Sequence, residues 1–283
     1  MRALLVILAG ATLLLAAGAC TGGGGGKTPT DPQELADRAL AAMADLDSYR
    51  AELDFGSEVG PLLAEFARPQ SYRLQGSFRQ QIGSGEAVDR VIESIYIDRD
   101  SYHRECERVD VGCAEWEKSQ GNTPAPAGPS PFYLPQWPLT ALDIAEGLAL
   151  DEREELGGEP VLKLTGTVNH IRAVMENLRV LYTEAGLTAF GQDCRDNPDG
   201  GQTCRDLTFD EALQQQEPGL TFFDGHPGTL EVWLSAQDYR VHRVRLTVPP
   251  FDDPSQGGDP SAVETSVSFD YSKFNDVTIK API

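Results

Sequence analysis

The number and spacing of the cysteines indicate which bonds they form. The chain has five cysteines, and four of them form two local pairs, Cys106 with Cys113 and Cys194 with Cys204. Neither pair has the spacing of a zinc site, and no histidine lies at a suitable offset in the same loop. We therefore predict two disulfides, which form in compartments outside the cytoplasm. Cys20 is left over and needs its own explanation.

The segment before Cys20 has the parts of a secretory signal peptide. Met1-Arg2 gives a positive start, and Ala3–Ala17 is almost unbroken apolar sequence. This run is shorter than the about 20 apolar residues that a membrane-spanning helix needs. Small residues follow it directly, up to the cysteine. We expect residues 1–19 to be a signal peptide.

The sequence Leu15-Ala16-Ala17-Gly18-Ala19-Cys20 resembles a bacterial lipobox, although Ala17 stands where Leu is commoner. The resemblance implies that the Cys20 thiol receives a diacylglyceryl group and that Cys20 becomes the first residue after cleavage. The alternative is an ordinary cleaved signal in which Cys20 is incidental. Residues 20–30 are Gly-rich and would form a flexible tether. The expected location is extracytoplasmic, with the acyl anchor in the cell membrane (outer face) or the outer membrane, where each buried methylene contributes about 0.8 kcal/mol.

Charge and composition limit the partners of the remaining chain. The 283 residues carry a formal net charge of -21, and 40% of them are hydrophobic. An acidic surface repels phosphate backbones, so nucleic acid is not an expected partner. This length is enough for one large domain or two small ones. We expect residues 31–283 to form a single domain, because strand signals of the same character resume after the loop at 120–138.

Catalytic and metal-binding patterns are not found in the sequence. The chain has four histidines, His103, His170, His226 and His242, and none of them lies in a metal-binding motif. The Gly-x-Ser-x-Gly pattern of many hydrolases does not occur. We therefore predict no enzyme activity, no catalytic residue, no metal and no cofactor.

Periodicity predicts a few helices and many strands. Asp31 can cap a helix that begins at Pro32, and Asn169 can cap a second amphipathic helix that stops at Gly186. Alternation of apolar and polar residues predicts strands with one buried face. The main predicted strands are 49–55, 72–79, 88–98, 148–156, 161–168, 230–235, 243–248 and 263–271. The other expected segments are a helical turn at 61–67, a short helix over 140–148 and an irregular acidic region over 187–226.

These elements predict an α+β fold. Strands that are polar on one side favour an antiparallel sheet with one face exposed to solvent. We expect a strongly curved antiparallel sheet, an unclosed half-barrel, with helices packed on its concave, apolar face.

The pattern resembles the LolA/LolB superfamily, and more closely the LppX/LprG-type bacterial envelope lipoproteins. The likeness rests on the lipobox, tether and first helix followed by Ser48–Leu53, on the hairpin Gly228–Val244 with Trp233 in its first strand, and on the ending Phe269–Pro282. The resemblance implies a hydrophobic interior that binds acyl chains of lipids or lipoproteins. Compared with that family, the region at about 169–226 would be an inserted helix and disulfide loop within the single domain.

Two functions fit these features. The first is a lipid carrier or chaperone that binds a lipid or an acylated molecule in a hydrophobic cavity. The alternative is a non-enzymatic envelope scaffold or sensor that binds a protein partner, in which the same apolar residues form a dry core. Sequence does not separate a filled interior from a hollow one. The candidate cavity residues are Tyr72, Leu74, Phe78, Leu162, Leu164, Leu230, Val232, Leu234, Val244, Leu246, Val267 and Phe269.

Overall fold

The structure is a computed structural model that describes part of the chain. The described residues are 29–56, 62–69, 71–81, 87–97, 100–107, 111–120, 133–184, 191–196, 200–250 and 264–282. The predicted signal peptide, Cys20 and nearly all of the predicted tether lie outside them, so these stay predictions.

The described strands form one eleven-stranded antiparallel sheet and a separate two-stranded hairpin. The strand order in the large sheet is β6-β5-β4-β3-β2-β1-β13-β12-β11-β8-β7, so β6 and β7 form its two edges and the sheet does not close. The first and last of the described strands, β1 and β13, pair at its centre. The strands are β1 (Ser48–Asp54), β2 (Leu62–Ala67), β3 (Ser71–Gln81), β4 (Ala87–Ile97), β5 (Asp100–Cys106), β6 (Glu117–Gln120), β7 (Glu146–Leu156), β8 (Glu159–Val168), β11 (Gly228–Ser235), β12 (Val241–Val248) and β13 (Thr265–Ser272).

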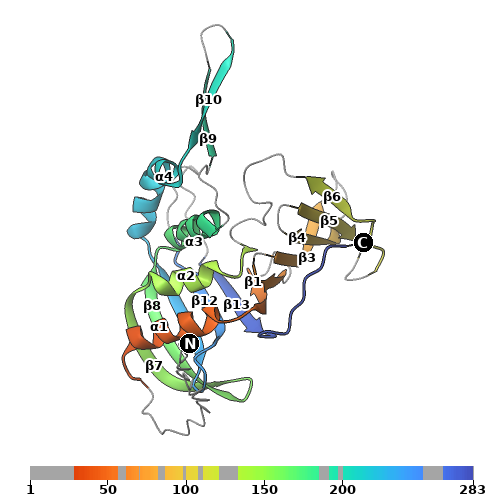
Figure 1. Cartoon of the computed structure of the whole chain (residues 1–283). Coiled ribbons are helices and arrows are strands. Elements are labelled where there is room, and N and C mark those ends of the chain that lie inside the picture. Colours follow the sequence, from red (N-terminus) through yellow and green to blue (C-terminus); the bar gives the residue numbers. More distant parts are fainter. Residues whose placement is uncertain are drawn as a thin grey trace, which may run out of the picture.

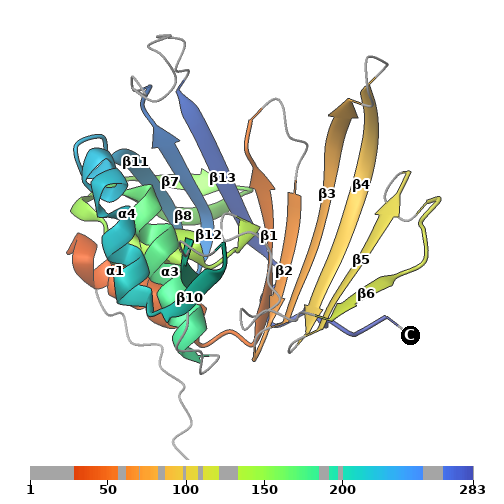
Figure 2. The same ribbon diagram turned by 90° about the horizontal axis from the view of Figure 1, so that it is seen from above.

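The helices gather on one side of one half of this sheet (Figures 1 and 2). They lie near β7, β8 and β11–β13, while β3–β6 extend away from them as a wing. The helices described are α1 (Pro32–Ala44), α2 (Trp137–Asp143), α3 (His170–Glu184) and α4 (Phe209–Asp224). None of these helices has both the length and the apolar content needed to span a membrane. The expected α+β class, with an open antiparallel sheet and helices packed on it, is confirmed.

Local sequence explains where the two predicted amphipathic helices begin. The Asp31 carboxylate accepts hydrogen bonds from the backbone N–H groups of Gln33 (2.9 Å) and Glu34 (3.3 Å). The Asn169 side-chain oxygen accepts from the backbone N–H of Arg172 at 3.0 Å. Both caps satisfy helical donors that have no partner inside the helix, as the sequence predicted.

Two short segments differ from the sequence prediction. Residues 62–67 are strand β2 and not a helical turn, because Leu62, Ala64 and Phe66 alternate inward and Glu65 points to the opposite face. The short helix α2 ends at Asp143, and the chain is already in strand β7 from Glu146. The signals in these segments were too short for a period of 2 to be told from one of 3.6.

The region expected to be irregular contains a hairpin and a helix. β9 (Gly191–Asp196) pairs with β10 (Gln202–Leu207), and α4 follows at once. Thr208 and Glu211 form a capping box at the start of α4: the Glu211 N–H donates to the Thr208 hydroxyl at 3.3 Å, and the Thr208 N–H donates to the Glu211 carboxylate at 3.0 Å. This S/T-x-x-E pattern was present in the sequence and would have revealed the helix.

Disulfides join both local cysteine pairs in the structure. Cys106, the last residue of β5, is bonded to Cys113 in the following loop. Cys194 and Cys204 are directly opposite each other on β9 and β10, and a disulfide links them. Each bond closes a local loop.

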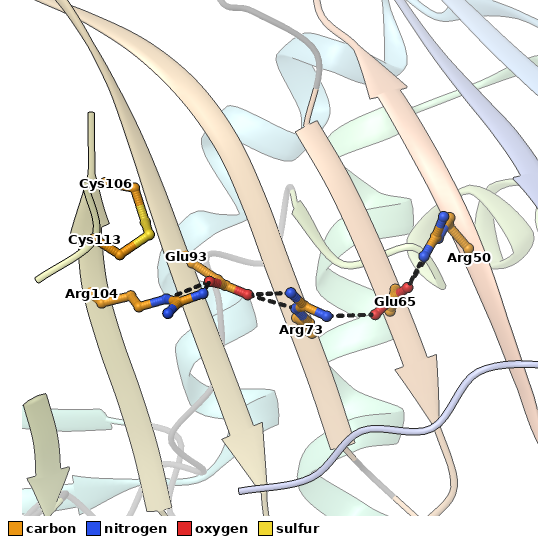
Figure 3. Close-up of polar contacts among 7 residues, drawn as sticks. All are labelled: Arg50, Glu65, Arg73, Glu93, Arg104, Cys106 and Cys113. Atoms are coloured by element: carbon orange, nitrogen blue, oxygen red, sulfur yellow. Dashed lines mark hydrogen bonds and ion pairs between the residues drawn. A yellow bond between two sulfur atoms is a disulfide. The ribbon is translucent and has the colours of Figure 1, made fainter. Parts of the chain in front are cut away.

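A row of alternating charges crosses the outer face of β1–β5 (Figure 3). We call it the charge ladder, and it consists of Arg50, Glu65, Arg73, Glu93 and Arg104. The Arg50 Nε atom is 2.9 Å from Glu65, and the Nε atoms of Arg73 and Arg104 lie 2.7 and 2.6 Å from the two oxygens of Glu93. Glu65 and Glu93 are buried, but each has an arginine on both sides, as buried charges require.

His170 at the start of α3 predicts a loss of stability in mild acid. Its ring packs edge-on against Phe223 at 5.1 Å, and its buried Nδ1 has no partner. Burial lowers the pKa of His170 from 6.5 to about 4. The unfolded chain therefore takes up this proton first as pH falls, and stability is lost between about pH 6.5 and 4. We expect about 2 kcal/mol less stability at pH 5 than at pH 7 from this group.

The measurement is urea unfolding at pH 7 and pH 5 for the natural chain and for His170→Gln, whose side chain does not titrate. Carboxylates protonate in both proteins, so the difference between them isolates the histidine. Equal losses in the two proteins would contradict the prediction.

Candidate functional site

The described residues enclose a cleft of about 630 Å³ between the helices and the adjoining ends of β1–β3. Its floor is a row of aromatic rings, which we call the aromatic row: Tyr49 of β1, Phe66 of β2 and Tyr72 of β3. Strand register places Tyr49 opposite Phe66 and Phe66 opposite Tyr72. Their ring centroids are 5.2 and 5.5 Å apart, within the range of favourable aromatic contact.

The helices form the walls of the cleft. The last turns of α1 contribute Leu40, Met43 and Ala44, and α3 contributes one face from Arg172 to Leu181. The third wall comes from α2 and consists of its N-cap Gln136 with Leu139, Thr140, Asp143 and Ile144. Most of this lining is apolar, and the volume lies within the roughly 300–1,000 Å³ of small-molecule sites.

Three buried polar atoms at the cleft have no hydrogen-bond partner: the Tyr49 hydroxyl, Oε1 of Gln136 and Nδ2 of Asn177. The Tyr49 and Asn177 residues are only 2% and 3% exposed. Burial, as the main cause, raises the pKa of Tyr49 far above its ordinary value, so its hydroxyl stays protonated at neutral pH. Unpartnered buried polar atoms are rare in folded proteins, and these three belong to residues that line the cleft.

Charged groups lie among the lining residues, but each arginine already has a partner. Arg68 donates from Nε to the Leu46 carbonyl at 2.9 Å, which satisfies a carbonyl beyond the end of α1. Arg172 pairs with Asp224 at 3.0 Å, and Arg179 pairs with Glu176 at 2.7 Å. Elsewhere among the described residues, no cluster of histidine, cysteine, aspartate and glutamate could hold a metal ion.

The cavity candidates from the sequence lie mostly in the core and not at the cleft. Tyr72 lines the cleft, and Val267 packs partly buried against the core. Phe78 lies in β3, but its side chain is outside the described part. The others are buried in one core cluster that includes residues of α1 and α2: Leu74, Leu162, Leu164, Leu230, Val232, Leu234, Val244, Leu246 and Phe269. The described helices thus fill the concave face over the centre of the sheet, and the cleft is displaced to its side.

Sequence reasoning missed most of the cleft, although one signal was present. In α3 the most buried positions are Ala173, Val174 and Asn177. An amide within the buried face of an amphipathic helix is unusual and indicates either a hydrogen-bond partner or a site. Leu40, Leu139 and Leu181 gave no such signal, because leucine lines cores and clefts alike.

No protein-family model matches the chain, and no curated protein matches it at a significant level. Two solved structures resemble it over most of both chains. The lipoprotein LppX of Mycobacterium tuberculosis covers 88% of this chain and 98% of its own, with 12% identity and a TM-score of 0.42. LprF from Mycobacterium bovis covers 91% of this chain and 99% of its own, with 13% identity and a TM-score of 0.48. Both likenesses have identities below 25% and TM-scores below 0.5, and they concern the fold alone.

Proposed function

We propose that this protein is a non-enzymatic envelope lipoprotein that binds a lipid acyl chain in the cleft and acts as a lipid carrier or chaperone. The observation that carries the proposal is a mostly apolar cleft of about 630 Å³ between the aromatic row and the helices. Each methylene moved from water to such a site gains about 0.8 kcal/mol. Acylation of Cys20 would hold the domain at a membrane, where acyl chains are available.

Native mass spectrometry and a fluorescence titration test this function. The chain from Thr21 onward is used, because every described element lies after that residue. We expect a lipid to co-purify under gentle conditions, and the delipidated protein to bind a pyrene-labelled acylglycerol. A lipid-free mass together with no uptake of the probe would refute acyl binding.

Leu139→Trp is predicted to block the cleft. Leu139 lines the cleft on α2 and is only partly buried, so a larger ring can occupy the free volume without entering the core. We expect the affinity for the labelled acylglycerol to fall by about tenfold or more, which is about 1.4 kcal/mol. The matched control is Val111→Trp, since Val111 is exposed and does not line the cleft. An unchanged affinity in Leu139→Trp, with the fold retained, would place the ligand elsewhere.

A second candidate function is a scaffold or sensor that binds a protein. The observation in its favour is the hairpin β9–β10, which extends away from the rest of the molecule (Figure 1). Its strand β10 is exposed except for Leu207, and a disulfide holds its two strands together. A photo-crosslinker at Thr203 in the native envelope tests it: a stoichiometric protein adduct on a chain without bound lipid favours this function over the carrier.

A further inference from the structure

We propose that the disulfide Cys194–Cys204 is a thiol–disulfide exchange site, at which a dithiol reductant outside the cytoplasm opens the hairpin β9–β10. The proposal goes beyond acyl binding and does not depend on it. Three observations support it: both cysteines of this bond are exposed, β10 buries only one residue, and the other disulfide has a cysteine buried in the large sheet.

The two disulfides differ in how easily a thiol can reach them. Cys194 and Cys204 are both exposed, and the hairpin that carries them extends away from the large sheet (Figure 1). Cys106 is only 3% exposed at the end of β5, where it is opposite Val91 of β4, and Cys113 is partly buried. Exchange requires a thiolate to attack a sulfur directly, so its rate depends on access. We therefore expect a reductant to react with the hairpin bond first.

The disulfide is the main constraint that keeps β9 and β10 together. An isolated two-stranded hairpin is only marginally stable in water, and Leu207 is the one buried residue of β10. Across the two strands, Arg205 lies 3.4 Å from Asp193, but an exposed ion pair of this kind adds little stability. Reduction removes the covalent link between strands whose remaining pairing is weak, so we expect β9 to separate from β10.

The contacts at the base of the hairpin do not involve the disulfide. Leu207 is only 5% exposed, and Arg205 lies 2.6 Å from Glu211 of α4. The capping box of Thr208 and Glu211 holds the start of that helix. The hairpin is also separate from the eleven-stranded sheet. Reduction is therefore expected to change the hairpin surface while α4 and the large sheet stay folded.

The exchange uses both thiols of the reductant. The first thiolate attacks one sulfur, so that the Cys194–Cys204 bond breaks, a mixed disulfide forms and the other cysteine leaves as a thiolate. The second thiolate of the reductant then attacks the mixed disulfide and releases the remaining cysteine. Two electrons pass from the dithiol to the hairpin, and the reductant becomes a disulfide. The two protons that its thiols release end on the two cysteines.

Differential alkylation of the chain from Thr21 onward tests the exchange site. The folded protein is treated with dithiothreitol for increasing times, new thiols are blocked with iodoacetamide, and peptide mass spectrometry measures the labelled fraction of each pair. We expect Cys194 and Cys204 to be reduced at least about tenfold faster than Cys106 and Cys113, because access limits the attack. A thioredoxin kept reduced by its reductase should give the same order. In concentrated urea the difference should disappear, since both bonds are then accessible.

Limited proteolysis measures what reduction does to the hairpin. Arg195 follows Cys194 in β9, and its side chain is 81% exposed. We expect trypsin to cleave after Arg195 at least about fivefold faster once the bond is reduced, because a strand must leave its hairpin to enter a protease. The double variant Cys194→Ser with Cys204→Ser should show this cleavage without reductant. The matched control, Cys106→Ser with Cys113→Ser, should keep the hairpin resistant.

The outcomes separate an exchange site from an inert disulfide. Equal reduction rates for the two pairs in the folded protein, or faster reduction of Cys106 and Cys113, would overturn the exchange site. Selective reduction with unchanged cleavage after Arg195 would overturn the opening of the hairpin. The alkylation uses the natural cysteines, so it decides the matter even where the control variant does not fold. Neither readout involves a lipid, so a failure of acyl binding would leave both results intact.

Discussion

Trp137→Ala is expected to lower the free energy of unfolding by about 3–5 kcal/mol, the range for removing a large buried aromatic side chain. Trp137 is the first residue of α2 and is buried in the core. Its ring meets Phe269 of β13 edge-on, with centroids 5.3 Å apart. Because this contact fixes α2 on the centre of the sheet, the substitution leaves a cavity beneath a helix of only seven residues, which has little stability of its own.

The same change should weaken acyl binding. Three residues close to Trp137 in the sequence line the cleft: Gln136, Leu139 and Thr140. We expect urea denaturation to report the stability loss and the labelled acylglycerol to report the binding loss. The control is Trp116→Ala, because Trp116 is only partly buried and lies under the Arg104 guanidinium at 4.5 Å, a contact of about 1 kcal/mol. A Trp137→Ala protein as stable as this control would show that α2 is not anchored by its tryptophan.

The parts of the fold that the sequence predicted are those with long, regular signals. Leu230, Val232 and Leu234 alternate with polar residues and are buried as expected. The helices that begin after Asp31 and Asn169 carried both a cap and an apolar stripe. β2 and α2 have six and seven residues, too few for a periodic pattern, and their form is set by the neighbours on which they pack.

The cleft was much harder to predict than the fold. Leu164 and Leu139 are the same residue type, yet Leu164 is fully buried under the helices while Leu139 lines open space. The difference depends on where α1, α2 and α3 pack on the sheet. Those packing positions are set by contacts between distant parts of the chain. Polar residues in apolar surroundings were the better guide, as Asn177 shows.

The two faces of β1–β3 carry paired features that are adjacent in sequence. Tyr49 precedes Arg50, Phe66 follows Glu65 and Tyr72 precedes Arg73. Since side chains alternate across a strand, the charge ladder lies directly behind the aromatic row. The ion pairs on the outer face therefore bridge the strands that form the floor of the cleft.

Glu93→Gln tests the charge ladder where it is most buried, and we expect a loss of about 2–3 kcal/mol in the free energy of unfolding. The Glu93 side chain is only 1% exposed and lies between Arg73 and Arg104 (Figure 3). Glutamine keeps the size but leaves two cations facing each other across a neutral group. The loss stays below the about 3–5 kcal/mol of a fully buried pair, because both arginines reach solvent and are partly screened.

Salt concentration distinguishes this repulsion from a packing defect. Screening by 1 M NaCl, where the Debye length is about 3 Å, should recover part of the stability of Glu93→Gln. The control is Glu34→Gln, which breaks the exposed ion pair to Arg38 on α1 and should cost about 0.5 kcal/mol or less. If Glu93→Gln unfolded at the same urea concentration as this control, the outer-face charges would be solvated neighbours, and the floor of the cleft would owe its register to backbone pairing alone.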